Sequence, residues 1–427
     1  MTEYVARKGN RPRFCKTGLS VLTSLRGIAN KAKDQPKYRF RNLYGMIDKE
    51  LLIHAWRGLN KKACAGVDEV MAQEYGKDLE ANLDDLIDRL KRQAYRAKLI
   101  KRKLIPKGDG KTRRLGIPTL EDRLLQKAVA MILGSIYDPT FLDCSYGYQP
   151  GKDVKMALKS FRDELNFNFC YDTVVEADIR GFFDNLEHEK LIEMLEVRID
   201  DRKLIRLIRK WLKAGILEPD GMVVNPLTGT PQGGIISPIL ANVYLHYVLD
   251  LWMEKAVKPG LRGRVKYVRY ADDFVCAFTC ESDAKRYHAA LPGRLGKFGL
   301  EVAEEKTRVL RFSRSDRSKF TQRITFLGFE LYWGKDRKGC SNLKRRTNRK
   351  RLRRGIKHVS EWIRKNRSTP FVALIDQLND KLRGYYQHYG VIGNAASLGT
   401  FYYYVNKSLF KWLNRRSQKK SFTSLTL

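Results

Sequence analysis

The sequence predicts an α+β protein in which an antiparallel sheet with its helices is followed by a separate α-helical segment. Three observations lead to this class. Amphipathic helical periodicity begins near residue 43. Short runs of β-branched and aromatic residues predict strands in the middle of the chain. After Trp333 the composition becomes basic, and the apolar residues again recur with a helical period. At 427 residues the chain is long enough for two or three packed units.

Lysine and arginine dominate the charge balance. The chain has 83 Lys and Arg residues against 47 Asp and Glu, a formal net charge of +36. Such an excess repels itself in a compact body unless a polyanion neutralises it, and nucleic acid is the obvious polyanion. A ribosome-like surface or a membrane-surface binder would share this balance, so charge alone does not decide. No apolar run is long enough to span a membrane, and we expect a protein without a membrane partner.

The N-terminal residues and the cysteines offer no catalytic motif. Residues 1–42 are basic and aperiodic, and we expect a flexible or RNA-bound arm. Part of this arm weakly resembles a transit peptide, although a nucleic-acid-binding role fits it equally well. The seven cysteines form no CxxC pair and have no histidines at zinc spacing, which indicates reduced thiols in a cytoplasmic protein.

A basic β-hairpin is predicted at residues 96–114. The segment carries nine lysines and arginines in and around a turn that runs from Pro106 to Gly110, which is the pattern of a hairpin with a glycine tip. Such a hairpin could close over phosphates. A solvated hairpin needs surface charges as well, so the segment by itself favours neither interpretation.

Two segments place acids at the ends of apolar strands. Residues 173–179 form a strand that ends at Asp178, and residues 265–278 read as strand, tight turn and strand with Asp272 and Asp273 at the turn. Neighbouring strands of one antiparallel sheet would bring the three acids together. Adjacent carboxylates repel each other, a cost that a bound cation relieves, and Mg²⁺ prefers carboxylate oxygens. An exposed Asp-Asp turn is the alternative.

The remaining segments predict helices and further strands. A glycine turn at residues 229–234 precedes a long apolar helix that begins at Ser237, and Pro292 with Gly293 should kink or break a later helix. Residues 307–312 and 324–333 are strand candidates. The basic cluster at residues 344–357 is followed by helices near 371–389 and 397–413, which indicates a separate helical domain.

These motifs, in this order, resemble those of reverse transcriptases. Tyr270-Ala271-Asp272-Asp273 is similar to the YxDD box, and residues 176–184 are similar to the first acid box. Residues 230–238 resemble the intervening turn and helix, 299–307 the late lysine box, and 326–329 the primer grip. The segments 105–118, 145–148, 378–386 and 410–417 narrow the resemblance to group II intron-encoded reverse transcriptase/maturases of the bacterial type.

The resemblance implies a fold and a set of partners. It implies a right-hand polymerase with fingers and palm at residues 43–335 and a basic helical thumb/maturase domain at 336–427. It also implies RNA-directed DNA synthesis with two Mg²⁺ ions, for which Mn²⁺ could substitute. The implied partners are an RNA template with a DNA primer, dNTPs, group II intron RNA and target DNA, while the oligomeric state stays open.

The same resemblance implies roles for four sets of residues. The catalytic and metal-binding set is Asp178, Asp272 and Asp273, with the backbone carbonyl of Ile179 as an extra metal ligand. The dNTP-binding set is Lys107, Arg113, Phe183, Gln232, Gly233 and Lys306. The primer grip is Phe326, Leu327 and Gly328. The RNA-binding set is Lys344, Arg345, Arg346, Arg349, Lys350, Arg351, Arg353 and Arg354.

Phe183 has the sharpest expected role. A ring under the sugar would clash with a 2′-hydroxyl and so select deoxynucleotides. The alternatives are an ordinary core phenylalanine at 183 and, for Lys306, an ordinary surface lysine.

Some features depart from the family pattern, and two other functions fit the chain. Arg114 stands where the family usually has proline, and no Cys-rich HNH endonuclease segment follows the maturase-like one, so independent DNA cleavage is not expected. One alternative is an RNA-binding splicing cofactor without polymerase activity. The other is a domesticated reverse transcriptase in host defence, which an intron RNA fold in the flanking DNA would distinguish from an intron-encoded protein.

Overall fold

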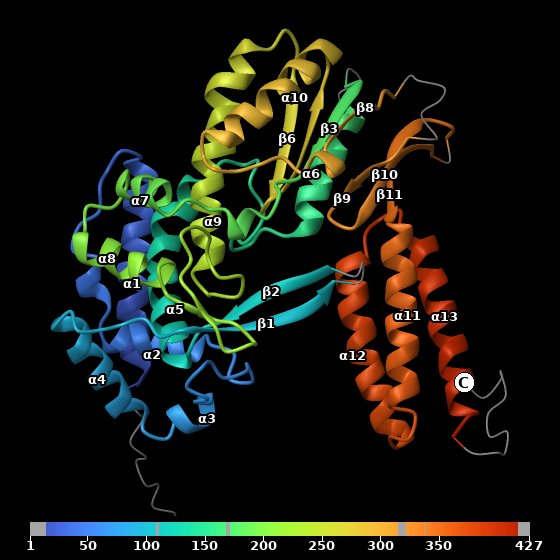
Figure 1. The fold of residues 1–427 in the computed structure, drawn as a ribbon. Helices are drawn as coiled ribbons and strands as arrows, with labels where there is room; N and C mark the ends of the chain where they lie inside the picture. Colours follow the sequence, from blue (N-terminus) through green and yellow to red (C-terminus); the bar gives the residue numbers. More distant parts are fainter. Residues whose placement is uncertain (1–13, 108–110, 168–170, 315–321, 337, 417–427) are drawn as a thin grey trace, which may run out of the picture. The chain divides into compact units, whose positions relative to one another are not determined.

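The computed structural model describes residues 14–107, 111–167, 171–314, 322–336 and 338–416 (Figure 1). The chain forms two compact units that are built from interleaved segments. Unit 1 comprises Met1–Leu142, Gly181–Asp250 and Lys297–Leu300, and unit 2 comprises Asp143–Arg180, Leu251–Gly296 and Glu301–Leu427. The predicted α+β class is confirmed, because strands and helices occur in both units.

Unit 1 is mainly helical and is organised around α5, which is buried along most of its length. The side chain of Thr119 accepts a hydrogen bond from the backbone N–H of Asp122 and so caps the start of this helix. Helices α1 and α2 pack against it. The helices of the unit are α1 (Phe14–Asp34), α2 (Lys49–Arg57), α3 (Ala72–Tyr75), α4 (Leu79–Lys91), α5 (Leu120–Tyr137), α7 (His188–Glu196), α8 (Arg202–Leu212) and α9 (Ser237–Leu245).

The sheet of unit 1 contains the predicted basic hairpin. Strands β1 (Ile100–Lys107) and β2 (Lys111–Ile117) are antiparallel, with Ile105 opposite Arg113. Two short strands, β4 (Ile216–Leu217) and β5 (Val223–Val224), extend the sheet in the order β2-β1-β4-β5. The pair β1 and β4 is parallel, so this sheet is mixed rather than purely antiparallel.

The expectation of an aperiodic arm is wrong for the part of it that the structure describes as α1. Val21, Leu25 and Ala32 are buried on this helix, and they recur at spacings of four and seven residues, which is the period of one helical face. Of the lysines and arginines, only Arg26 and Lys31 lie between them, but the basic composition of residues 1–42 as a whole obscured this apolar stripe. Residues 1–13 of the expected arm lie outside the described residues.

Unit 2 is built on a four-stranded antiparallel sheet, here called the central sheet, with the order β6-β7-β3-β8. Its strands are β3 (Thr173–Ala177), β6 (Val265–Tyr270), β7 (Asp273–Phe278) and β8 (Arg308–Arg311). Val174 joins an apolar cluster with Phe161 of α6 (Val154–Phe167). Phe278, on the other face, contacts Tyr287 of α10 (Glu281–Gly296). Both faces are therefore covered, which explains why every residue of β3 is buried.

Helix α10 runs through Pro292, so the predicted break there is wrong. Tyr287, Leu291 and Leu295 are buried on one face, whereas Pro292 and Gly293 are exposed. Solvent can satisfy a carbonyl that loses its helical donor on the exposed face, and packing of the buried face holds the helix together.

The C-terminal part of unit 2 contains a small sheet and three long helices. The sheet has the order β11-β10-β9, with β9 (Ile324–Phe326), β10 (Phe329–Lys335) and β11 (Ser341–Thr347). The helices α11 (Arg349–Lys365), α12 (Phe371–Tyr389) and α13 (Ala395–Leu413) lie side by side (Figure 1). Ile363, Leu374 and Phe401 come from the three different helices and share one buried cluster. The predicted helical C-terminal segment is confirmed.

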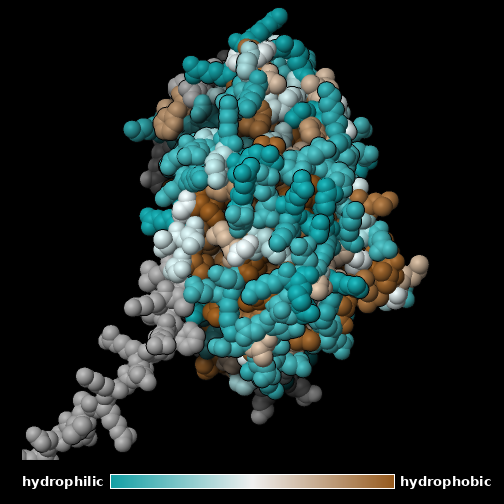
Figure 2. Space-filling view, turned by 90° about the vertical axis from the view of Figure 1, so that its left-hand side faces the viewer, coloured by the Kyte–Doolittle hydropathy of each residue, from teal (hydrophilic) through white to brown (hydrophobic). Residues whose placement is uncertain are grey.

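The surface agrees with the basic composition. Figure 2 shows a face on which hydrophilic residues predominate and hydrophobic residues form smaller patches. Helix α8 shows how one helix can serve both surface and core, because Arg202 and Arg206 are exposed while Leu204 and Ile208 are buried. Among the described helices, none has the length and apolar character needed to cross a membrane.

Candidate active site

The three predicted acids lie at one end of the central sheet. Strands β3 and β7 are antiparallel with Ala177 opposite Phe274, so the next position along the chain, Asp178, comes opposite Asp273. Side chains at opposed positions of antiparallel strands project to the same face. Asp272 lies next to them, in the two-residue turn between Tyr270 and Asp273. The structure therefore brings Asp178 together with two acids that are far from it in the sequence.

The pKa of Asp273 is raised from 3.8 to about 6. Loss of hydration is the largest cause, and the charges of Asp272 and Asp178 add to it. The side chain of Asp273 keeps part of its surface accessible to water, although protein atoms surround it densely. Arg351 and Lys306 act in the opposite direction and lower this pKa. A bound cation would relieve the same repulsion.

Lys306 neutralises Asp178. Its ammonium group donates a hydrogen bond to Asp178 Oδ2, and this bond raises the pKa of the lysine. Within the described ranges, no group of three or more His, Cys, Asp or Glu side chains is arranged to hold a metal ion. Lys306 occupies Asp178 Oδ2 in this structure, so a cation that bound this carboxylate would compete with Lys306 for it.

The backbone around Asp178 is fixed by a bridge to the segment before β8. The N–H of Ala303 donates to the Asp178 carbonyl at 2.8 Å, and the N–H of Arg180 donates to the Glu301 carbonyl at 2.9 Å. Ile179 is the bridged residue between these two bonds, and it is buried. Its own carbonyl takes part in neither of them, which is compatible with the expected role as an extra metal ligand.

The turn that carries Asp272 is conformationally unusual. Ala271, the first of its two turn residues, has a φ of +56°. Residues other than glycine pay a steric cost of about 1 kcal/mol or more in this left-handed region. The surrounding structure must therefore hold the turn in place.

The three primer-grip residues lie at the tip of the hairpin formed by β9 and β10. Phe326 pairs with Phe329, and Leu327 and Gly328 form the turn with φ values of +51° and +89°. A side chain added at Gly328 would lie 3.2 Å from Cδ of Arg351, so this tip adjoins the first turn of α11.

The expected nucleotide-binding residues, apart from Lys306, belong to unit 1. The N–H of Thr230 donates to the Phe183 carbonyl at 2.7 Å, and the N–H of Gly116 donates to the Gln232 carbonyl at 2.7 Å. Two hydrogen bonds thus link Phe183 and the glycine turn that contains Gln232 and Gly233 to the base of the basic hairpin. The ring of Phe183 is half-buried and packs edge-on against Phe182, with centroids 5.3 Å apart.

The hairpin carries the other two expected nucleotide contacts. Lys107 is the last residue of β1, and residues 108–110 of its tip lie outside the described residues. Arg113 is exposed on β2. Both residues are thus near the tip of the hairpin in the order of the strands, with Lys107 opposite Lys111 and Arg113 opposite Ile105.

The predicted RNA-binding set divides into exposed and structural residues. Arg345 is buried and donates through Nε to the Ile392 carbonyl at 3.2 Å. Arg346 pairs with Glu330 at 2.9 Å. Arg345 therefore does not face a nucleic acid in this structure, because alternation along β11 turns it into the core. Lys344 is half-buried, and the exposed members are all on α11: Arg349, Lys350, Arg351, Arg353 and Arg354.

Sequence reasoning missed two residues beside the acids. Arg269 stands two residues before Ala271, the first residue of the turn, and is fully buried. The available signal was a cation in the strand that leads to two adjacent acids. Arg351 was expected only to contact RNA, yet its charge lowers the pKa of Asp273. That effect depends on how α11 is placed in unit 2, which residue spacing does not reveal.

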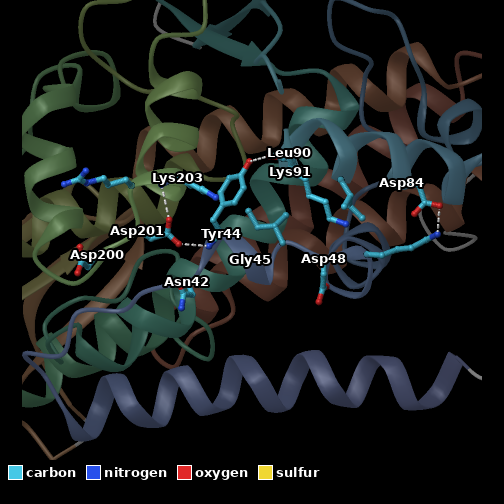
Figure 3. Close-up of a pocket in the computed structure, with 14 residues that line it drawn as sticks. Asn42, Tyr44, Gly45, Asp48, Asp84, Leu90, Lys91, Asp200, Asp201 and Lys203 are labelled. Atoms are coloured by element: carbon cyan, nitrogen blue, oxygen red, sulfur yellow. Dashed lines mark hydrogen bonds and ion pairs between the residues drawn. The ribbon is translucent and has the colours of Figure 1, made fainter. Parts of the chain in front are cut away.

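A separate cavity of 890 Å³ lies in unit 1 (Figure 3). Tyr44 donates its N–H to Asp201 at 2.8 Å and its hydroxyl to the Leu90 carbonyl at 2.9 Å across this cavity. Four acidic side chains, Asp48, Asp84, Asp200 and Asp201, are offset by four basic ones, Lys49, Lys91, Arg202 and Lys203. This balance favours no charged ligand, and the cavity contains none of the predicted site residues.

Comparison with known proteins gives concordant results. Residues 105–331 match the family described as reverse transcriptase (RNA-dependent DNA polymerase), and residues 349–426 match the group II intron maturase-specific domain. The group II intron-encoded protein LtrA of Lactococcus lactis subsp. cremoris is 28% identical over 95% of this chain and 80% of its own length. Protein YkfC of Escherichia coli is 32% identical over 58% of this chain and 74% of its own length.

Among solved structures, an apo telomerase from Candida tropicalis aligns with a TM-score of 0.45 and 16% identity over 61% of this chain and 59% of its own. The family match covers more than half of the chain, and the maturase-specific match lies C-terminal to it. The chain therefore belongs to the reverse transcriptases, which are RNA-directed DNA polymerases, and within them to the group II intron-encoded reverse transcriptase/maturases.

Proposed function

We propose that this reverse transcriptase copies RNA into DNA by a nucleotidyl transfer that depends on two divalent metal ions. Asp178, Asp272 and Asp273 hold these ions, and Mg²⁺ is the preferred ion. The observation that supports this most strongly is the convergence of the three carboxylates at one end of the central sheet. The pKa of Asp273 is raised there by lost hydration and by the charges of the other two acids. Oxygen ligands of this kind are those that Mg²⁺ prefers.

The donor set fits a divalent cation, and the chain's own residues prepare the site for it. The chemistry that such ions supply is activation of the primer hydroxyl and stabilisation of the leaving oxygen. Lys306 donates to the Asp178 carboxylate, and in this proposal its ammonium group would donate a proton or bind phosphate. Ile179 contributes its backbone carbonyl.

For the nucleotide, we assign Lys107 and Arg113 to the triphosphate, and Phe183 to the sugar. Gln232 and Gly233 contact the nascent base pair. The support is local: two backbone hydrogen bonds join Phe183, the glycine turn and the base of the hairpin in unit 1. In this proposal residues 43–335 act as fingers and palm, and residues 336–427 as thumb and maturase domain.

We further propose that the maturase domain binds group II intron RNA, assists its splicing and supports retrohoming into target DNA. The exposed cations of α11 support this, because phosphate contacts supply most of the affinity for structured RNA. Leu327 and Gly328 would hold the primer beside the same helix.

The decisive experiment is primer extension on an RNA template with dNTPs and Mg²⁺. Asp272→Asn and Asp178→Asn should each lower the rate by at least about 10³-fold, since removal of an essential acid leaves no substitute ligand. Asp78→Asn, the same change at an exposed site, should retain the full rate. Equal extension by Asp272→Asn and the wild type would reject the catalytic assignment.

The same variants separate a polymerase from a pure splicing cofactor. Asp272→Asn should still bind intron RNA, with an unchanged salt dependence of the affinity, and should still promote splicing. The substitution leaves the exposed cations of α11, which contact the RNA in this proposal, unchanged. If the wild type promotes splicing but extends no primer under any divalent ion, the chain is an RNA-binding cofactor whose polymerase site is inactive.

A further inference from the structure

Arg269, the next-to-last residue of β6, is completely buried. Its guanidinium group donates through Nη1 to the Ala271 carbonyl at 3.0 Å and through Nη2 to the Ser145 hydroxyl at 2.8 Å. Burial of a charged group is unfavourable unless its donors are satisfied. The first of these bonds holds the one residue of the turn that has a left-handed φ, directly before Asp272.

The partner of Arg269 is itself fixed in place. The N–H of Arg269 donates to the Cys144 carbonyl at 2.8 Å, and the N–H of Tyr146 donates to the Arg269 carbonyl at 2.9 Å. These bonds form a parallel bridge between Ser145 and Arg269. The side-chain amide of Gln149 donates to the Ser145 hydroxyl at 2.7 Å, so this hydroxyl cannot turn freely.

Gly147 brings the same segment against the turn. A Cβ atom at this position would overlap the Ala271 nitrogen and lie 3.0 Å from the Ala271 Cα. Both of these are backbone atoms, which cannot move aside without moving the turn. The absence of a side chain at 147 is therefore a condition for the observed position of Ala271.

We propose that Arg269, Ser145 and Gly147 form a brace that sets the position of Asp272 and Asp273 through the backbone of Ala271. They are positioning residues, since they touch the turn rather than substrate or metal. The inference rests on the proposed metal-binding role of the acids, and it adds that their spacing is imposed by the 144–149 segment as well as by the β6–β7 hairpin itself.

The test uses Arg269→Lys, Ser145→Ala and Gly147→Ala in the full chain. Lysine keeps the positive charge but cannot reach both oxygen atoms with a planar fork. Two quantities are measured: the Mg²⁺ and dNTP dependence of primer extension, and Mn²⁺ binding to the protein without nucleic acid, by electron paramagnetic resonance of the free ion. The second measurement does not require activity.

We expect Arg269→Lys and Gly147→Ala to raise the half-saturating Mg²⁺ concentration and to lower kcat, each by about 10- to 100-fold, as is typical when a group that orients a metal ligand is changed. Ser145→Ala should act in the same direction but less, because one of the two guanidinium bonds remains. The KM for dNTP should stay within about twofold of the wild type, because the nucleotide contacts are untouched. Mn²⁺ affinity should fall in parallel with Mg²⁺ dependence.

A matched control distinguishes positioning from general stability. Arg198 is also buried and donates to three backbone carbonyls, those of Ala32, Gln35 and Tyr38. Arg198→Lys should lower the unfolding temperature about as much as Arg269→Lys while leaving the Mg²⁺ half-saturation unchanged. All variants are compared at temperatures where circular dichroism shows them folded.

The brace is overturned if folded Arg269→Lys and Gly147→Ala both keep the wild-type Mg²⁺ dependence and Mn²⁺ affinity, or if Arg198→Lys alters these as strongly as Arg269→Lys does. Asp272→Asn separates this outcome from failure of the proposed function. If Asp272→Asn loses metal binding while the brace variants do not, only the brace is wrong; if Asp272→Asn also keeps metal binding, the metal site itself is wrong.

Discussion

Asp273→Asn should stabilise the metal-free protein at neutral pH. In the folded chain the pKa of Asp273 is raised from 3.8 to about 6 by lost hydration and by the charges of Asp272 and Asp178. A raised carboxyl pKa means that the folded state binds the proton more tightly than the unfolded state does. The ionised carboxylate therefore opposes folding, by an amount that grows as the pH rises from about 4 and is complete above about 6.

The size of this effect follows from the shift. A difference of about two pKa units corresponds to about 3 kcal/mol at full strength, but the side chain is exposed enough for solvent to screen it, so we expect about 1 kcal/mol. For a unit of this size that is an increase of about 2 °C in the unfolding temperature.

The assay is thermal unfolding in EDTA at pH 7.5 and at pH 4, with Asp78→Asn as the matched control. Asp273→Asn should unfold at a higher temperature than the wild type at pH 7.5 and at the same temperature at pH 4, while Asp78→Asn should match the wild type at both. Mg²⁺ should stabilise the wild type but not Asp273→Asn, because only the former retains the ligand. A lower unfolding temperature for Asp273→Asn at pH 7.5 in EDTA would refute the reasoning.

Four further outcomes follow from the structure. Lys306→Ala should tighten Mn²⁺ binding by the metal-free protein several-fold, because Asp178 loses its competing cation, and should slow extension about 100-fold; weaker Mn²⁺ binding would contradict this. Phe183→Ala should increase ribonucleotide incorporation relative to deoxynucleotide by about 10- to 100-fold, measured on one template, and an unchanged ratio would remove the sugar-selecting role. Arg353→Ala should lower the slope of log affinity for RNA against log salt by about one, whereas Arg345→Ala should leave that slope unchanged. Glu330→Gln should cost about 2 kcal/mol in urea unfolding, because this buried carboxylate accepts hydrogen bonds from Arg346, Asn348 and the N–H of Arg349; a loss below about 0.5 kcal/mol would contradict that role.

The sequence was sufficient for elements that local patterns specify. The apolar run of β3, the β6–β7 hairpin and the basic hairpin all follow from side-chain alternation and turn residues, and each was located correctly. The order of the acid-bearing segments also carried the family assignment, because several motifs in a fixed order are far more specific than one.

Features that depend on tertiary packing were not predictable. Helix α10 persists through Pro292 because Leu291 and Leu295 are buried on its other face. Helix α1 was missed because the basic composition of the N-terminal residues hid the apolar face that packs against the rest of unit 1. In both cases burial overrides the local signal, and burial is known only once the neighbouring elements are placed.

The candidate site shows the same division. Types and spacing of residues identified Asp178, Asp272 and Asp273, but the pairing register that brings Asp178 opposite Asp273 is a property of the assembled sheet. The ion pair of Lys306 with Asp178, the burial of Arg345 and the contacts of Arg269 likewise depend on strands that are distant in the chain. A pattern of charges does not show which of them face the solvent.

Cleavage of the backbone by bound Fe²⁺ tests the metal assignment most directly. Fe²⁺ in place of Mg²⁺, with ascorbate and peroxide, generates hydroxyl radicals that cut the chain near the ion. We predict cuts close to residue 178 and close to residues 272 and 273 in the wild type, suppressed by excess Mg²⁺ and lost in Asp272→Asn but not in Asp78→Asn. Cuts confined to other segments, or an unchanged pattern in Asp272→Asn, would show that the three acids do not share a metal site.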